Sequence, residues 1–245
     1  LPRVSGANQG KALSIEVDGV SYERLPIRTR VVMPGDDLDA IIREYTAGQL
    51  QQGDLLFVTE KIVAITQGRS YQLDEITPRR LARFLSKYVT RTSYGIGLGM
   101  PETMEMALRE CGTPRILLAA AVSAVTKAFG RSGDFYRVAG YKARSIDGPT
   151  AHTIPPYNTA VVLGPEKPKQ VAEHVRSLLD VPVEVAVVDI NDIGGNILGS
   201  TLDRAGEQRL VRILGDNPLG QGHESTPLGV IRTVRLPRRP GGHPN

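Results

Sequence analysis

The sequence predicts a protein of the α+β class, with mixed sheets and flanking helices. Two observations favour this class. Strand-like apolar runs occur within the first 66 residues and again near residue 185, and helical spacing of apolar residues dominates between them. The chain has 245 residues, of which 40% are hydrophobic. That length and composition are enough for a sizeable core, in one large domain or two smaller ones.

Three strands and one helix are expected in the first part of the chain, after a flexible leader over residues 1–11. Segments 13–20 and 22–32 have the composition of strands, and segment 55–66 reads as a strand that contains polar residues. Between them, Pro34–Asp37 provides a helix start signal. Apolar residues then recur at helical spacing, at Leu38, Ile41, Ile42 and Tyr45.

Three further helices and one strand are predicted downstream. One helix begins at Thr77–Pro78, with threonine at the N-cap and proline at the first helical position. Another runs from Pro101 to a stop at Gly112, and a third covers about 169–179. Segment 183–189 is apolar and rich in β-branched residues, which indicates a strand buried on both faces. In the first of these helices, the residues expected to face the core are Leu81, Phe84, Leu85 and Tyr88.

Residues 12–234 are expected to form a single domain, or two intertwined subdomains with a boundary near residues 147–158. The formal charge is +4, and residues 235–245 are expected to form a basic, flexible tail. We do not expect nucleic-acid binding, because no platform of aromatic and basic residues accompanies that tail. The longest apolar run, 116–125, is too short to span a membrane. With a single cysteine and no signal-peptide pattern, the expected location is cytoplasmic.

A lysine and an arginine follow an apolar run in Thr59–Lys61 and Gln67–Arg69. A half-buried lysine suits the binding of a phosphate group, because its ammonium is a compact point charge. The same pattern is equally typical of an edge-strand lysine, which prevents strands of different molecules from pairing. From the residues alone both interpretations of Lys61 stand, and Arg69 is a second candidate phosphate ligand.

A set of acidic residues lies beside glycines or prolines, mostly where predicted strands end. Carboxylate oxygens in such loops are the ligands that Mg²⁺ or Mn²⁺ needs when it binds a nucleotide phosphate. Each aspartate alone is better explained as a turn former, but the whole set favours a metal site. No histidine spacing typical of a zinc hydrolase occurs. The candidate metal ligands are Asp147, Asp189, Asp192 and Asp216, with Asn217 as a candidate nucleotide ligand.

Two motifs resemble segments of the coenzyme F420-0:γ-glutamyl ligase family. GDLLFVTEKIVAITQGR, residues 53–69, is similar to a strand-and-lysine segment of that family, which typically reads G-D-hydrophobic-V-T-x-K. DINDIGGNILG, residues 189–199, is similar to its later S-D-T-x-G-R segment. A third stretch, AAAVSAVTKAFG, falls where the family carries N-A-G-V-D-x-S-N. The resemblance covers about residues 25–232.

The resemblance implies an ATP- or GTP-dependent acid–amino-acid ligase with a mixed α+β fold that has no P-loop and no ATP-grasp. In that family a substrate carboxylate is activated as an acyl phosphate, and an amino acid such as L-glutamate supplies the attacking amine. The resemblance also implies Mg²⁺ or Mn²⁺, a small-molecule carboxylate substrate and a homodimer. The alternatives are a non-catalytic nucleotide- and metal-binding relative of that fold, or a metal-dependent phosphotransferase or hydrolase.

Two catalytic residues follow when the family motifs are carried over position by position. Lys61 matches the family lysine and is expected to neutralise phosphate oxygens. Asp192 matches the metal-binding aspartate of S-D-T-x-G-R, which makes it the best single candidate for a metal ligand.

The sequence also departs from the family pattern at three positions. Ser123 stands where the family has its other metal aspartate, Gln67 replaces a glutamate, and Asn196 replaces an arginine. We expect Asp147 or Asp216 to replace the carboxylate that is missing at Ser123. These departures leave the acceptor substrate undefined, while the fold expectation stands.

Overall fold

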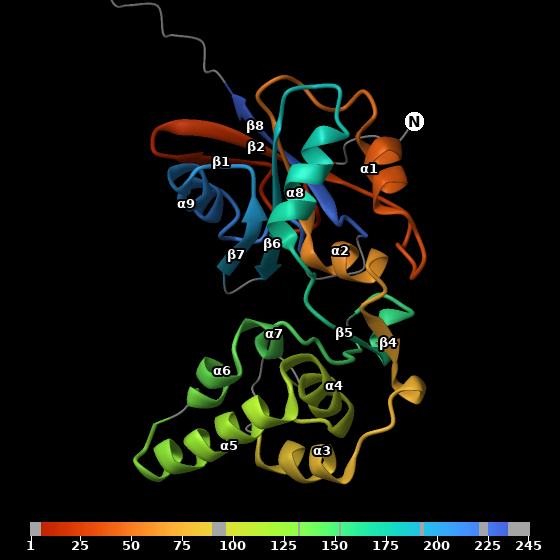
Figure 1. The fold of residues 1–245 in the computed structure, drawn as a ribbon. Helices are drawn as coiled ribbons and strands as arrows, with labels where there is room; N and C mark the ends of the chain where they lie inside the picture. The colour runs from red at the N-terminus through yellow and green to blue at the C-terminus, as the bar shows by residue number, and fades with distance from the viewer. Residues whose placement is uncertain are drawn as a thin grey trace, which may run out of the picture. The chain divides into compact units, whose positions relative to one another are not determined.

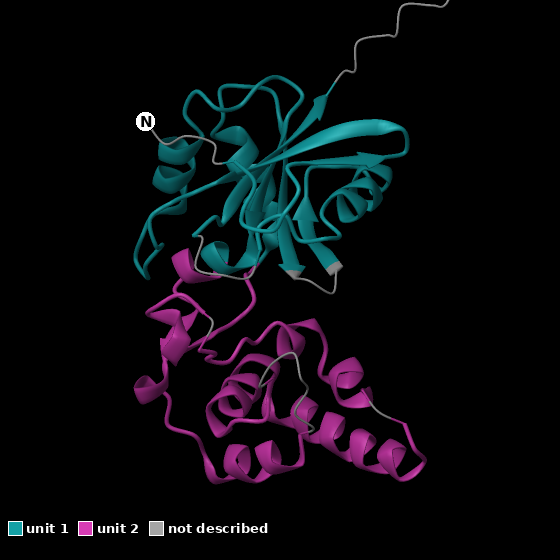
Figure 2. Ribbon diagram, turned by 180° about the vertical axis from the view of Figure 1, so that it is seen from behind, with its two compact units in different colours: residues 1–63, 167–245 teal, residues 64–166 magenta. Residues whose placement is uncertain are grey.

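The computed structural model describes residues 6–89, 97–131, 133–151, 153–191, 194–220 and 225–234. The chain divides into two compact units, which Figure 2 shows in different colours. Unit 1 consists of residues 1–63 and 167–245, and unit 2 consists of residues 64–166. Unit 2 is therefore inserted within the sequence of unit 1, and segment 147–158 lies inside unit 2. No helix in the described ranges is long and apolar enough to cross a membrane.

Unit 1 is built on a six-stranded sheet with the strand order β1-β2-β8-β3-β6-β7 (Figure 1). The neighbours β3 and β6 are parallel, and every other neighbouring pair is antiparallel. This mixed sheet confirms the α+β class that the sequence predicted. The strands are β1 (Ser14–Val17), β2 (Val20–Ile27), β3 (Leu55–Thr59), β6 (Glu184–Asn191), β7 (Gly194–Ser200) and β8 (Leu228–Val234).

Strands β3 and β6 are buried on both faces, as the composition of segment 183–189 predicted. Leu56, Phe57 and Val58 of β3 are fully buried. Residues 185–188 of β6 are also fully buried. Burial of each valine, leucine or phenylalanine side chain stabilises the fold by about 1.5–3 kcal/mol. These buried side chains anchor both strands in the core of unit 1.

Helices cover both faces of this sheet. Those of unit 1 are α1 (Leu38–Thr46), α8 (Pro168–Ser177) and α9 (Arg204–Ile213), and α2 (Glu60–Thr66) runs from unit 1 into unit 2. Helix α9 packs on the face to which Phe57 and Val188 point. On the other face, Gly199 lies opposite Val187 in the sheet and against the backbone of Lys169 in α8. The sheet is thus the middle layer of unit 1.

The start signals of two helices are side-chain caps. Asp37 accepts a hydrogen bond from the backbone N–H of Asp39 at 3.1 Å and begins α1. Asp203 accepts one from Gly206 at 2.7 Å and begins α9. Each cap satisfies a backbone donor that has no partner within its helix, which stabilises the helix by about 1 kcal/mol.

Unit 2 is mainly helical. Its helices are α3 (Arg80–Leu85), α4 (Pro101–Cys111), α5 (Thr113–Ala128), α6 (Asp134–Ala139) and α7 (Tyr141–Arg144), and a two-stranded sheet pairs β4 (Ser70–Gln72) with β5 (Ala160–Val162). Short 3-10 turns lie at Leu73–Glu75, Ser86–Tyr88 and Tyr157–Thr159. The predicted helix from Pro101 to Gly112 is confirmed. The core of this unit includes Leu98, Met104, Leu108, Ile116 and Val161.

The segment 55–66 is not one strand, so that expectation was wrong. Strand β3 ends at Thr59, and α2 begins at the next residue. The β-branched residues that suggested a strand are buried within α2, because tertiary packing outweighs β-propensity here. Helix α2 ends at Thr66. Two residues later the φ of Gly68 is +71°, which allows Gly68 N–H to donate to the Ile65 carbonyl and Arg69 N–H to donate to the Ala64 carbonyl, each at 2.9 Å.

The prediction of which residues face the core in the helix after Thr77 was also wrong in part. Phe84 and Tyr88 are exposed, and their rings contact each other with centroids 5.1 Å apart. Leu85 is buried as predicted, and Ala82, which was not expected to face the core, is buried as well. Helix α3 has only six residues and continues into a 3-10 turn, so the apolar positions do not stay on one face over the whole segment.

Candidate functional site

The carboxyl ends of the parallel strands β3 and β6 meet at one edge of the unit 1 sheet, which we call the carboxyl edge. In the register of this pair, Thr59 lies opposite Val188, so β3 ends beside the last residues of β6. Strands β7 and β8 begin at the same edge, because each is antiparallel to one of these strands. In open sheets with parallel strands, ligands bind beyond such carboxyl ends.

Lys61 lies at this carboxyl edge, in the first turn of α2. The residue is partly exposed as a whole, but burial around its ammonium lowers the pKa of Lys61. The carboxylates of Glu60 and Asp189 act in the opposite direction and raise that pKa. A desolvated cation thus lies close to carboxylates from two different elements. Such an environment is typical of functional sites.

Lys61 does not protect an edge strand. Strand β3 is an inner strand, hydrogen-bonded to β8 on one side and to β6 on the other. The interpretation of Lys61 as a residue that prevents edge-to-edge pairing is therefore wrong. An ammonium at the open end of an inner strand is positioned to bind an anionic group.

Two of the candidate metal ligands belong to the end of β6. Asp189 lies on β6, two residues before the strand ends, and its carboxylate interacts with the Lys61 ammonium. Asp192 follows the last residue of β6 directly in the sequence and lies outside the described residues. Over the ranges that the structure describes, no group of three or more His, Cys, Asp and Glu side chains is arranged to hold a metal.

Asp216 is engaged by an arginine in unit 1. The side chain of Arg24 is fully buried, and its guanidinium forms an ion pair with the Asp216 carboxylate. The same guanidinium donates to the carbonyls of Ile213 at 3.1 Å and Ala12 at 2.7 Å. Because a buried guanidinium requires a counter-charge, Asp216 has a structural partner here.

Asn217 shapes the turn that follows this ion pair. It is buried, its φ is +52°, and its side-chain amide donates to the carbonyl of Gly220 at 3.1 Å. Asn8 also contacts this turn: its amide donates to the carbonyl of Leu219 at 2.7 Å and to the hydroxyl of Thr226 at 2.8 Å. These bonds fix the backbone that approaches the start of β8.

The remaining candidate metal ligand, Asp147, belongs to unit 2. Its backbone forms an isolated antiparallel bridge with Val162, in which the two N–H···O distances are 2.8 and 3.0 Å. Among the four aspartates, Asp189 is thus the one for which the described residues show an interaction with Lys61.

Arg69 is the centre of an ion-pair network within unit 2. Its guanidinium contacts the carboxylates of Glu110 at 2.7 Å and Glu166 at 3.0 Å, and donates to the carbonyl of Gly164 at 2.7 Å. Gln67 also binds Glu166 in this network. The Gln67 side-chain amide accepts a hydrogen bond from Glu166 N–H at 2.8 Å and donates one to the Glu166 carbonyl at 3.0 Å. The network joins the segment after α2 to the end of unit 2.

Replacement of Arg69 by alanine is expected to lower the free energy of unfolding by about 1–3 kcal/mol, because the largely buried Glu110 loses a charged partner. Burial raises the pKa of Glu110, but hydrogen bonds from Lys142 and Arg69 outweigh it, so the pKa is lowered overall. Because the pKa of this carboxyl is lower in the folded protein than in the unfolded chain, the ionised carboxylate stabilises the fold at pH values above its unfolded pKa. This stabilisation is lost as the pH falls through the folded pKa.

Urea unfolding at pH 7 and at progressively lower pH measures this effect. The difference in the free energy of unfolding between the wild type and Arg69→Ala should become smaller as the pH falls and Glu110 becomes protonated. Arg144→Ala is the control, since it removes an exposed arginine of the same unit. Equal stability of the two variants at pH 7 would contradict the assigned role of Arg69.

Glu60 is the functional candidate that the sequence analysis missed. It is buried, with 8% of its surface exposed, and its carboxylate raises the pKa of the neighbouring lysine. The available signal was an acidic residue directly before Lys61. The sequence predicts a continuous strand here, in which adjacent side chains would point to opposite faces and Glu60 would not lie beside Lys61.

Two positions at which the sequence departs from the ligase motifs lie in different units. Ser123 is on α5 in unit 2 and is partly buried. Asn196 is on β7 in unit 1, directly opposite Asp189, and is exposed. An exposed asparagine thus lies across from the carboxylate that interacts with Lys61.

Comparison with known proteins identifies similar sequences. The sequence profile of the family described as F420-0:Gamma-glutamyl ligase matches residues 26–199. Over 243 residues the chain is 25% identical to the coenzyme F420:L-glutamate ligase of Methanopyrus kandleri, an alignment that covers 87% of this chain and 86% of that protein. The matched region includes β3, α2, β6 and all of β7 except its last residue, and these elements lie at the carboxyl edge around Lys61.

Proposed function

The chain belongs to the F420-0:gamma-glutamyl ligase family, and on that basis we propose that it joins an amino acid to a substrate carboxylate at the expense of ATP or GTP. The observation that supports this proposal is the desolvated Lys61 ammonium beside Glu60 and Asp189 at the carboxyl edge. By analogy with the name of the Methanopyrus relative, L-glutamate is the amino acid that we propose.

The proposed reaction has two group transfers. In the first, an oxygen of the substrate carboxylate attacks the γ-phosphorus, the bond to the β-phosphate oxygen breaks, and the nucleoside diphosphate leaves. The product is an acyl phosphate. In the second, the amine of the amino acid attacks the acyl carbon, inorganic phosphate leaves, and the amine loses a proton. Lys61 would neutralise negative charge on the transferred phosphoryl oxygens in both steps.

Glu60 and Asp189 would control the protonation state of Lys61. Their carboxylates favour the ammonium form, which burial alone disfavours. A lysine kept charged in a desolvated position binds phosphate oxygens more strongly than an exposed one, because water screens the interaction less. This is the role that the described residues support most directly.

A divalent metal fits the donor chemistry at the same edge. Mg²⁺ usually takes one or two carboxylates and leaves its other positions to water and phosphate oxygens. Asp189 and Asp192, near and directly after the end of β6, are the residues that we propose would hold it. When bound, Mg²⁺ or Mn²⁺ would neutralise charge on the β- and γ-phosphates. We do not include Asp216, since its carboxylate is paired with Arg24.

Thermal denaturation with nucleotide tests the proposal. GTP or ATP together with Mn²⁺ should raise the melting temperature of the full chain, and addition of L-glutamate and a carboxylate acceptor should accelerate phosphate release. A melting temperature that no nucleotide changes, with or without metal, would overturn the proposal. Nucleotide turnover that never depends on an amino acid would instead favour a phosphotransferase or hydrolase.

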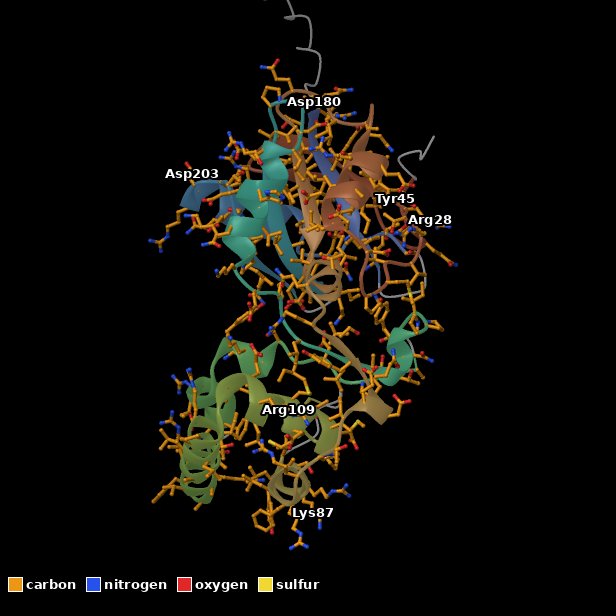
Figure 3. The ribbon with its side chains drawn as sticks, turned by 45° about the vertical axis from the view of Figure 1, so that its right-hand side comes forward. Arg28, Tyr45, Lys87, Arg109, Asp180 and Asp203 are labelled. Atoms are coloured by element: carbon orange, nitrogen blue, oxygen red, sulfur yellow. The ribbon has the colours of Figure 1, made fainter. Side chains whose placement is uncertain are left out.

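Asp192→Asn is expected to abolish the metal-dependent part of nucleotide stabilisation, because the amide lacks the charge that a hard divalent cation requires. The melting temperature without ligand should stay close to that of the wild type. Asp180→Asn is the matched control, as Asp180 is exposed and precedes β6 at its opposite end (Figure 3). If Asp192→Asn keeps the full stabilisation by metal and nucleotide, Asp192 is a turn residue only.

A second candidate function is a non-catalytic nucleotide-binding relative of the ligases. The serine at position 123 favours it, since the ligase motif has a carboxylate at that point. Under this alternative the nucleotide would stabilise the protein, but phosphate release would remain at the uncatalysed rate with every amino acid. Single-turnover measurement with γ-labelled nucleotide distinguishes the two functions.

A further inference from the structure

Asn8 joins the beginning of the described chain to residues that lie more than 200 positions away. Its side chain is buried, and its amide nitrogen donates hydrogen bonds to the carbonyl oxygen of Leu219 at 2.7 Å and to the hydroxyl oxygen of Thr226 at 2.8 Å. A buried N–H group needs such acceptors, because leaving it unpaired in the core is costly. One side chain therefore fixes two points of the chain that precedes β8.

The second of these points is linked to the start of α2. Pro227 follows Thr226, and its carbonyl oxygen accepts a hydrogen bond from the backbone N–H of Thr59 at 2.9 Å. This bond lies just beyond the paired residues of β3 and β8, at the carboxyl edge. Thr59 is the last residue of β3, and Lys61 follows two positions later in the first turn of α2. The position of the segment before β8 therefore bears directly on the position of Lys61.

Pro227 depends on its neighbours for its place beside β3. Proline has no backbone N–H, so it can offer only its carbonyl to a neighbouring strand. The direction of that carbonyl is set in part by Thr226, which is buried and whose hydroxyl is bound by the Asn8 amide. Asn8 thus supplies, from outside the sheet, a restraint that backbone pairing cannot supply at a proline.

The residue before Thr226 is held in an unfavourable backbone conformation. Ser225 has a φ of +50°, in the left-handed region that residues other than glycine rarely adopt. Thr29, which follows β2, holds it there: the Thr29 N–H donates to the Ser225 carbonyl at 2.9 Å, and the Ser225 hydroxyl donates to the Thr29 carbonyl at 3.0 Å. Such conformations persist where several contacts fix them, and they cluster at functional sites.

The segment that carries Asn8 is itself fixed within unit 1. The Asn8 carbonyl accepts a hydrogen bond from Lys11 N–H at 2.9 Å, and the Lys11 ammonium donates to the carbonyl of Asp216 at 3.0 Å. The guanidinium of the buried Arg24 donates to the carbonyl of Ala12 at 2.7 Å. These contacts tie the segment to β2 and to the turn before β8, so Asn8 acts from a defined position.

We propose that Asn8 is a positioning residue: through segment 225–227 it fixes the start of α2 and thereby places Lys61 at the carboxyl edge. The consequence for catalysis rests on the function proposed above, in which Lys61 neutralises charge on the transferred phosphoryl group. Asn8 and segment 225–227 both lie outside residues 26–199, which match the family profile. The role therefore comes from the contacts of this chain and not from the family comparison.

Steady-state phosphate release by the full chain tests the consequence for catalysis. Asn8→Ala should lower kcat by about 10- to 100-fold, since a displacement of about 1 Å in a catalytic group can cost about 100-fold in rate. Added to Lys61→Met, the same change should cause no further loss, because Asn8 acts through the Lys61 ammonium. Gln9→Ala, which changes the exposed neighbour of Asn8, should match the wild type. An equal loss with and without Lys61 would indicate a general structural role and overturn the proposal.

A second variant separates the positioning of α2 from support of the turn at Leu219. Thr226→Val keeps nearly the same shape and removes the hydroxyl that Asn8 binds, while the hydrogen bond from Asn8 to Leu219 can remain. We expect Thr226→Val to lower kcat as Asn8→Ala does. A wild-type kcat in this variant would show that Asn8 serves the turn alone, which would contradict the proposal.

Hydrogen exchange of the Thr59 amide, followed by NMR, tests the link without ligand or turnover. The Pro227 carbonyl protects this N–H, and local opening of the segment exposes it. In Asn8→Ala it should exchange roughly tenfold faster or more, whereas the amide of Phe57 in the middle of β3 should be unaffected. Unchanged exchange at Thr59 would overturn the proposal even if kcat falls. If the wild type shows no amino-acid-dependent phosphate release, the proposed function fails, and the exchange of Thr59 alone decides whether Asn8 fixes the start of α2.

Discussion

Lys61→Met is expected to reduce amino-acid-dependent phosphate release by about 100- to 1,000-fold, the usual effect of removing one preorganised charge from a phosphoryl-transfer site. Methionine keeps most of the length of lysine and lacks only its ammonium. The loss of phosphate-release rate therefore reports the contribution of the ammonium charge at the carboxyl edge and not a change in the packing of α2. Initial rates of phosphate release, at saturating nucleotide and amino acid, check the expectation.

The control for this change is Lys87→Met, since Lys87 is an exposed lysine of unit 2 (Figure 3). Its activity should match that of the wild type. The melting temperature of Lys61→Met should remain close to that of the wild type, because methionine removes the cost of a desolvated cation while Glu60 and Asp189 lose their counter-charge. Activity within tenfold of the wild type would show that Lys61 is not part of the reaction.

The pH dependence of the rate tests the same site through its electrostatics. Burial lowers the pKa of Lys61 below its ordinary value, so the ammonium is lost at lower pH than in an exposed lysine. If the ammonium is the active form, the rate should fall on the alkaline side as pH rises through this lowered pKa. Glu60→Gln removes a carboxylate that raises the pKa, and should shift this fall to lower pH. An unchanged alkaline limb would exclude Glu60 from this role.

The local features of the carboxyl edge were predictable from sequence, but their assembly was not. The apolar runs before Lys61 and Asp189 identified two strands, and the burial of β6 on both faces followed from its β-branched composition. The parallel pairing of β3 with β6 joins segments that are about 130 residues apart and on opposite sides of unit 2 in the sequence. No local pattern encodes such a long-range register, which depends on the packing of the whole unit.

For Arg69, the local sequence suggested phosphate binding, but the role of this residue depends on partners that are distant in the sequence. It follows Lys61 closely in the sequence, which made it a phosphate candidate. Its guanidinium contacts residues 41, 97 and 95 positions away, at Glu110, Glu166 and Gly164. Carboxylates that neutralise an arginine can be identified only when the fold is known, because their sequence separation is unrestricted.

The close contact between α8 and β7 leads to the second large effect, which concerns folding. Gly199→Ala is expected to destabilise the protein by at least about 3 kcal/mol, beyond the usual cost of an overpacked core. A Cβ at Gly199 would lie 2.2 Å from the backbone nitrogen of Lys169 and 2.5 Å from the carbonyl carbon of Pro168. Both atoms are backbone at the start of α8, so no side-chain rotation relieves the clash.

Gly195→Ala is the matched control on the same strand, because its Cβ would lie at ordinary van der Waals distances of 3.8 and 3.9 Å from its nearest neighbours. Urea unfolding followed by circular dichroism should give a wild-type-like midpoint for Gly195→Ala. For Gly199→Ala we expect a much lower urea midpoint, or no folded protein at all. Since β7 pairs with β6 through Asp189, any Gly199→Ala protein that folds should also bind nucleotide more weakly. A variant with normal stability would mean that α8 can move away from the sheet, and that the contact does not hold the carboxyl edge.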